Sequence, residues 1–130
     1  MQKSKEGFTT LTKAEMDIMN ILWELNEPAC VRQVIDHCKE PKPAYTTIAT
    51  FLKILLKKGF VSQERREDGG KSLFYFPLIT KDEYTRRVME DVKDNFFGGS
   101  AKSLVNFFCR EEKLTVDEVR ELLQMIGGEE

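Results

Sequence analysis

The chain has 130 residues, of which 41% are hydrophobic and 32% are charged, and its formal net charge is −2. This composition is typical of a globular protein and excludes disordered and collagen-like chains, and no apolar run approaches the roughly 20 residues that span a bilayer. Residues 1–10 contain no apolar signal segment. We therefore expect a cytoplasmic protein without membrane insertion, whose cysteines Cys30, Cys38 and Cys109 are reduced thiols.

Charge is distributed unevenly along the chain. In residues 41–77, seven Lys and Arg stand against three Asp and Glu, whereas in residues 78–130 eight basic residues stand against twelve acidic ones. Segregation of this kind favours a polyanion as the partner of the central segment and a different partner for the C-terminal segment.

Three helices are predicted in the first half of the chain. A T-x-x-E capping box at Thr12 and Glu15 starts the first helix, which ends at Asn26. A second, short helix follows from residue 31 and ends before Pro41. Apolar residues at helical spacing predict a third helix over residues 45–58, with a glycine where a left-handed C-terminal cap is expected.

The second half of the chain is predicted to hold a β-hairpin and further helices. Two aromatic or β-branched runs, residues 60–65 and 73–76, flank the turn sequence E-D-G-G-K, and three helical segments follow Pro77 with a break at Gly98 and Gly99. The expected fold class is mainly α, an α+β winged helix-turn-helix with a C-terminal helical dimerisation arm. We expect the DNA-binding domain over residues 1–78 and the dimerisation domain over residues 79–130.

The third helix is the candidate recognition helix. With Ile48, Leu52 and Leu55 turned inward, hydroxyls and lysines occupy the opposite side, where they suit contacts with phosphates and base edges. A short helix precedes it and a basic hairpin follows, which is the order of a winged helix-turn-helix. The predicted residues that bind double-stranded DNA are Lys42, Tyr45, Thr46, Thr47, Thr50, Lys53, Arg65, Arg66 and Lys71.

The C-terminal segment carries more apolar residues than a small helical unit can bury alone, which indicates a homodimer. A two-fold dimer would present two recognition helices to two half-sites. The predicted dimerisation residues are Phe96, Phe97, Leu104, Val105, Phe108, Leu122, Leu123 and Ile126.

Catalysis finds little support in the sequence. There is no glycine-rich phosphate loop, H-E-x-x-H or C-x-x-C motif, and the neighbours His37 and Cys38 point in different directions on a helix. We therefore expect no catalytic residue, no metal site, no cofactor and no enzyme activity.

Five short strings, in order, resemble the penicillinase repressor family (BlaI/MecI/CopY), and together they cover roughly residues 9–126. They are L-T-K-A-E (11–15) with I-L-W (21–23), A-Y-T-T-I (44–48), K-K-G (57–59), Y-F-P-L (75–78) and F-F-G-G-S (96–100). The resemblance implies a bacterial winged-helix repressor, linked to antibiotic resistance, that dimerises through its C-terminal helices on a palindromic operator. It also implies removal by proteolysis when a membrane sensor detects a β-lactam, with Asn106 and Phe107 flanking the cleaved bond.

The chain departs from the family pattern at several positions. Met16 stands where the family usually has Trp, and Ile54 stands where an Arg is common in the recognition helix. The paired C-x-C motifs of the copper-responsive branch are missing, since Cys109 is the only cysteine near the C-terminus. The operator sequence of relatives therefore does not transfer, and copper sensing is not expected.

Two other functions fit the same sequence. The winged helix can be a protein-interaction module without DNA activity, which the net acidic charge tolerates, or a DNA-binding regulator that is released by a small ligand between its helices. Steep salt dependence of binding separates DNA recognition from apolar docking, and thermal stabilisation by candidate ligands would identify the ligand-released regulator.

Overall fold

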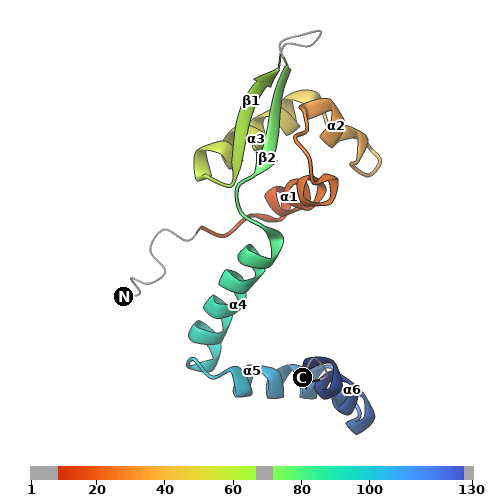
Figure 1. The fold of residues 1–130 in the computed structure, drawn as a ribbon, viewed down its shortest axis with the longest axis vertical. Helices are drawn as coiled ribbons and strands as arrows, with labels where there is room; N and C mark the ends of the chain where they lie inside the picture. The colour runs from red at the N-terminus through yellow and green to blue at the C-terminus, as the bar shows by residue number, and fades with distance from the viewer. Residues whose placement is uncertain (1–8, 67–71, 128–130) are drawn as a thin grey trace. The chain divides into compact units, whose positions relative to one another are not determined.

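The computed structural model describes residues 9–66 and 72–127 and divides the chain into two units, residues 1–88 and 89–130. The elements (Figure 1) are α1 (Lys13–Leu25), α2 (Val31–Asp36), α3 (Tyr45–Lys58), β1 (Val61–Arg66), β2 (Ser72–Pro77), α4 (Lys81–Phe97), α5 (Ala101–Glu111) and α6 (Val116–Gly127). This order confirms the predicted mainly α fold with a winged helix-turn-helix.

Local sequence signals set the ends of the helices. Thr12 Oγ1 accepts a hydrogen bond from Glu15 N at 3.2 Å, and Glu15 Oε1 accepts one from Thr12 N at 2.9 Å, which completes the capping box of α1. Asn26 ends α1 and Gly59 ends α3, both in the left-handed conformation with φ of 53° and 86°. The predicted bounds of α3 are therefore confirmed at both ends.

The wing is an antiparallel hairpin whose register runs from Val61 opposite Pro77 to Arg66 opposite Ser72. A further bridge joins β2 to the segment between α1 and α2. Ala29 N donates to Tyr75 O at 3.0 Å, and Tyr75 N donates to Ala29 O at 2.8 Å. The wing is thus tied to the helical core by backbone bonds that the sequence pattern did not predict.

The core of the N-terminal unit also includes the start of α4. Its buried hydrophobic side chains are Ile18, Met19, Leu22, Ala29, Val31, Val34, Ile48, Leu52, Leu55, Phe60, Val61, Tyr75 and Tyr84. The hydroxyl of Tyr84 accepts from Leu11 N at 2.7 Å, and its ring lies edge-on to Phe60 with centroids 5.8 Å apart. Trp23 Nε1 donates to Ile79 O at 2.8 Å. The connection into α4 is therefore fixed before the helix by Trp23 and within its first turn by Tyr84.

The C-terminal unit contains the end of α4, together with α5 and α6. Gly98 and Gly99 adopt positive φ values of 58° and 82°, which only glycine adopts at low cost, and they end α4 as predicted. Thr115 and Glu118 form a reciprocal capping box at the start of α6. No helix in the described ranges is long and apolar enough to cross a membrane.

Candidate nucleic-acid interface

Helix α3 presents a polar outer face. Ile48, Leu52 and Leu55 are buried, as predicted, while the predicted DNA-binding residues on this helix, Tyr45, Thr46, Thr47, Thr50 and Lys53, are all exposed. The helix contains no Asp or Glu. Its solvent face therefore offers hydroxyls and cations with no carboxylate of its own to repel a polyanion.

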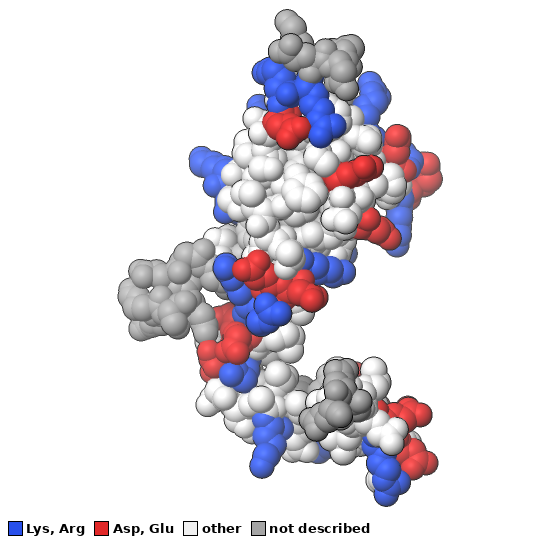
Figure 2. All heavy atoms as spheres, viewed as in Figure 1, with Lys and Arg blue, Asp and Glu red and all other residues white. Residues whose placement is uncertain are grey.

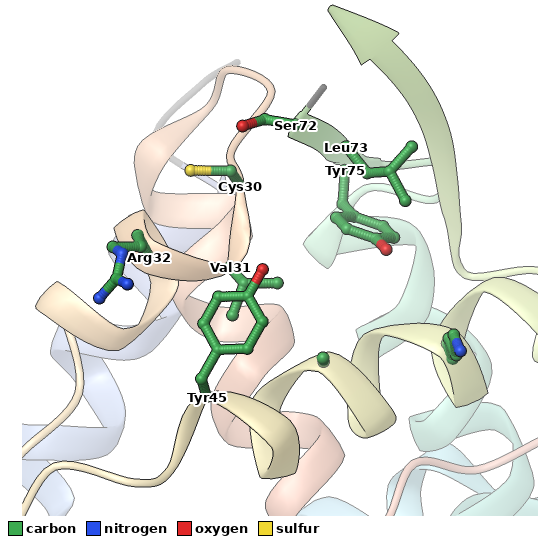
Figure 3. A pocket seen from close by; sticks show the side chains of 9 residues that line it. Cys30, Val31, Arg32, Tyr45, Ser72, Leu73 and Tyr75 are labelled. Carbon is green, nitrogen blue, oxygen red and sulfur yellow. The ribbon is translucent and has the colours of Figure 1, made fainter. Parts of the chain in front are cut away.

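One edge of α3 borders an open groove of about 550 Å³. Tyr45, Ala49 and Lys53, spaced by four residues, form the α3 side of this groove. The other lining residues are Cys30, Val31 and Arg32 at the start of α2 and Ser72, Leu73 and Tyr75 on β2, so none of the described residues that line it is a carboxylate. Figure 3 shows Arg32 and Tyr45 on one side of the groove and Leu73 and Tyr75 on the other.

Two of the lining residues, Arg32 and Tyr45, contact each other. The guanidinium carbon of Arg32 lies 5.7 Å from the centroid of the Tyr45 ring, which is within the range of a cation–π contact. Arg32 is not among the predicted DNA-binding residues, because α2 is short and only the packing of α2 against α3 brings Arg32 beside Tyr45.

The hairpin adds positive charge next to this groove, and Figure 2 shows Lys and Arg side chains gathered at the hairpin end of the N-terminal unit. Arg65 is exposed. Arg66 Nε lies 2.7 Å from Glu64 Oε2, and its guanidinium carbon lies 4.6 Å from the centroid of the Phe74 ring. Of the two arginines, Arg65 is therefore the better placed to contact a ligand. Lys71 lies outside the described residues.

Lys42 has a structural partner of its own. Its ammonium donates to Asp36 O at 3.0 Å and to Cys38 O at 2.7 Å, the carbonyls at the end of α2. These bonds satisfy carbonyls that the helix leaves without partners and order the turn that leads into α3. The structure therefore gives Lys42 a capping role, and its predicted contact with DNA stays a prediction.

A partly buried ion pair joins α3 to α1. Lys58 Nζ lies 2.9 Å from Oε1 and 3.0 Å from Oε2 of Glu15, whose side chain is only 4% exposed. Burial alone would raise the pKa of Glu15, but hydrogen bonds from Thr12 N and the Lys58 ammonium lower this pKa below its ordinary value. In the sequence, Glu15 is recognisable only as a capping residue, because nothing local shows a partner 43 residues away.

All three cysteines are free thiols, and burial raises the pKa of Cys38. Within residues 9–66 and 72–127, no group of three or more His, Cys, Asp and Glu side chains is arranged to hold a metal ion.

Comparison with known proteins identifies the family. A sequence profile described as "Penicillinase repressor" matches residues 11–128. The chain belongs to the penicillinase repressor family. It is therefore a transcriptional repressor and not an enzyme.

Individual repressors align over nearly the whole chain. It is 28% identical to the penicillinase repressor of Staphylococcus aureus over 117 residues, which cover 90% of each protein. It is 28% identical to the methicillin resistance regulatory protein MecI of Staphylococcus aureus over 118 residues, covering 90% of this chain and 93% of MecI. It is 32% identical to the transcriptional regulator BlaI of Mycobacterium tuberculosis over 118 residues, covering 88% of this chain and 83% of BlaI.

In this chain, the residues predicted for dimerisation and for cleavage lie on three helices. Phe96 and Phe97 end α4, Asn106 and Phe107 lie within α5, and the last predicted dimerisation residues lie on α6. The rings of Phe97 and Phe107 contact each other with centroids 5.6 Å apart. The predicted cleavage position is thus inside a formed helix.

Proposed function

We propose that this repressor is a homodimer that binds a palindromic operator through its winged helix-turn-helix and is inactivated by proteolysis in its C-terminal arm. The DNA-binding part of this proposal is supported by the carboxylate-free outer face of α3. Thr46, Thr47 and Thr50 suit base edges, because a threonine donates a hydrogen bond and its methyl group contacts thymine. Lys53 and Arg65 suit phosphates.

The single observation that supports a dimer is that the described part of the C-terminal unit has no buried core of its own. None of the described residues 89–127 is buried. Even large apolar side chains are exposed there, with Phe96 76% and Ile126 75% exposed. The other exposed large apolar residues there are Met89, Val105, Phe107, Phe108, Val116, Leu122, Leu123 and Met125. Exposed apolar surface of this extent indicates a partner. A second copy supplies an identical face, and an obligate interface of about 2,000 Å² or more would cover it.

Proteolysis at Asn106 and Phe107 would end repression without changing the DNA surface. Positive-φ glycines precede α5 and a turn at residues 112–113 follows it, and such flanks lower the free energy of local opening. A cut in α5 separates α6 from the rest of the chain. The dimer then loses part of its interface, and two-site binding falls to single-site binding, a loss of roughly 10² to 10⁴ in avidity. The names of the relatives, penicillinase repressor and methicillin resistance regulatory protein, favour a β-lactam as the signal. A membrane sensor that passes this signal on is what the family resemblance implies.

The operator and the dimer are tested together. Genomic fragments retained by the full chain are sequenced, and the mass of the free protein is measured by sedimentation. We expect a two-fold-symmetric sequence, affinity that falls steeply with salt, and a dimer. Retention of no DNA, or affinity that is independent of salt, would instead favour the protein-interaction module.

The cleavage is tested in cells that produce the repressor. After a β-lactam is added, intact mass spectrometry should detect a fragment that ends at Asn106, and Asn106→Ala and Phe107→Ala should reduce this fragment and prolong repression. Full-length wild-type protein in cells whose target genes are switched on would refute cleavage.

A further inference from the structure

We propose that the groove between α3 and the wing seats one sugar–phosphate strand of duplex DNA, with Arg32 and Lys53 binding its phosphates and Ala49 leaving room for it. This inference rests on the proposed DNA binding and adds the position of the backbone to it. Arg32 and Ala49 thereby gain a role that the predicted set of DNA-binding residues does not give them, and the exposed residues of α3 divide into those that border the groove and those that face base edges.

The shape of the duplex determines what must lie between a recognition helix and a wing. The major groove is about 12 Å wide and admits an α-helix, whereas the adjacent minor groove is about 6 Å wide. A single sugar–phosphate strand separates the two. If α3 enters the major groove and the hairpin lies over the neighbouring groove, that strand crosses the space between them. In this structure that space is the open groove of about 550 Å³.

The chemistry of the groove matches a polyanion. Cations reach it from two elements, Arg32 from α2 and Lys53 from α3, and hydroxyls reach it from Tyr45 and Ser72. Within the described residues neither Arg32 nor Lys53 forms an ion pair. Other nearby cations are engaged: Lys58 pairs with Glu15, and Arg66 pairs with Glu64. Arg32 and Lys53 therefore line the groove without an ion pair to another described residue.

Ala49 explains how a strand fits between these cations. It lies one turn from both Tyr45 and Lys53 on the groove edge of α3 and is partly buried. Its methyl group is the smallest side chain on this edge. A longer apolar side chain at this position would occupy part of the groove without changing the net charge. Residues 46 and 50 lie on the adjacent stripe of α3 and remain available for base edges.

The test measures the binding of full-length variants to fluorescein-labelled duplexes by anisotropy over a series of salt concentrations. One duplex has random sequence and the other is selected by the wild-type protein from a random pool. Arg32→Gln is compared with Lys39→Gln, which loses the same charge on an exposed residue outside the groove. Ala49→Leu is compared with Ala49→Ser, and Arg32→Lys tests whether charge alone restores binding. Circular dichroism verifies that each variant is folded.

We expect Arg32→Gln to weaken both duplexes alike and to reduce the slope of log K against log salt by about one, as loss of one phosphate contact requires. Lys39→Gln and Ala49→Ser should behave as wild type, and Arg32→Lys should recover most of the slope. Ala49→Leu should reduce affinity and slope at unchanged net charge. The ratio of selected to random affinity should stay constant in all of them.

Three results would refute the proposal that a sugar–phosphate strand occupies the groove. Equal effects of Arg32→Gln and Lys39→Gln would show that only net charge matters, and wild-type binding by a folded Ala49→Leu would show that no strand occupies the groove. A changed ratio between the two duplexes would make Arg32 a base reader. In all three cases the wild type still binds DNA and the proposed function stands. A wild-type protein that binds neither duplex would refute both.

Discussion

Replacing Lys58 with Met should destabilise the N-terminal unit, because it leaves the Glu15 carboxylate buried without its cation. The Glu15 side chain is 4% exposed and that of Lys58 is 28% exposed, so the pair lies between two known limits. Exposed pairs contribute about 0–1 kcal/mol, whereas breaking a fully buried pair costs about 3–5 kcal/mol. We expect a loss of about 2 kcal/mol, which corresponds to roughly 8–16 °C in the melting temperature of a domain of this size.

The two partners should differ in their effect. Glu15→Gln keeps an oxygen that accepts from Thr12 N and leaves the Lys58 ammonium with access to water, so its cost should be about 1 kcal/mol. Lys57→Met is the matched control, because Lys57 is the neighbouring exposed lysine of α3. It should change the free energy of unfolding by less than about 0.5 kcal/mol.

Acid should reduce the difference between wild type and Lys58→Met. The pKa of Glu15 lies below its ordinary value of 4.5, so its stabilising contribution is complete above that value and is lost as pH falls through the lower folded-state pKa. Without Lys58, burial is offset by fewer groups and the pKa of Glu15 rises. Protonation then removes a buried charge, so the variant loses less stability in acid than wild type.

The assay is urea unfolding at neutral pH and at a pH below 4.5, followed by the fluorescence of Trp23, the only tryptophan of the chain. Trp23 packs near Tyr84 and donates to Ile79 O, so its emission reports on the N-terminal unit. Protein concentration is held constant, because a dimer makes stability depend on it. The reasoning fails if Lys58→Met and Lys57→Met unfold at the same urea concentration, or if the difference from wild type is equal at both pH values.

Three further predictions concern the other parts of the molecule. Thr50→Ala should relax selection at one base pair of each half-site by roughly 1–3 kcal/mol, seen by repeating the operator selection; an unchanged preference would exclude base reading by Thr50. Tyr84→Phe removes the hydroxyl that accepts from Leu11 N and should cost about 1 kcal/mol in urea unfolding, whereas an unchanged midpoint would mean that this bond adds no stability. Leu123→Asp should shift sedimentation from dimer to monomer with the Trp23 emission unchanged, and a persistent dimer would place the interface elsewhere.

Much of the fold follows from signals that are local in the sequence. The capping box at Thr12, the left-handed Gly59 and the Gly98–Gly99 break fix helix ends through bonds and φ values within a few residues. The buried face of α3 follows from spacing alone, because a helix repeats every 3.6 residues. These elements could therefore be predicted one at a time.

The features that sequence reasoning missed depend on contacts between distant segments. Three contacts join residues that are far apart in the sequence: Glu15 with Lys58, Ala29 with Tyr75, and Phe60 with Tyr84. None of these contacts produces a regular spacing of residues that could be recognised in the sequence. The candidate interface was predicted on the outer face of α3 and in the hairpin, where spacing and charge are visible in the sequence. Arg32 enters it only through the packing of two helices.

The adjacent stripes of α3 bear on how such repressors diverge. Residues 45, 49 and 53 border the groove, and residues 46 and 50 lie on the neighbouring stripe of the same helix. If the first stripe holds the backbone and the second reads bases, a substitution at position 46 or 50 changes which operator is chosen while the strength of attachment is preserved. Duplicated copies of such a gene can then acquire separate operators through few mutations, without an intermediate form that no longer binds DNA.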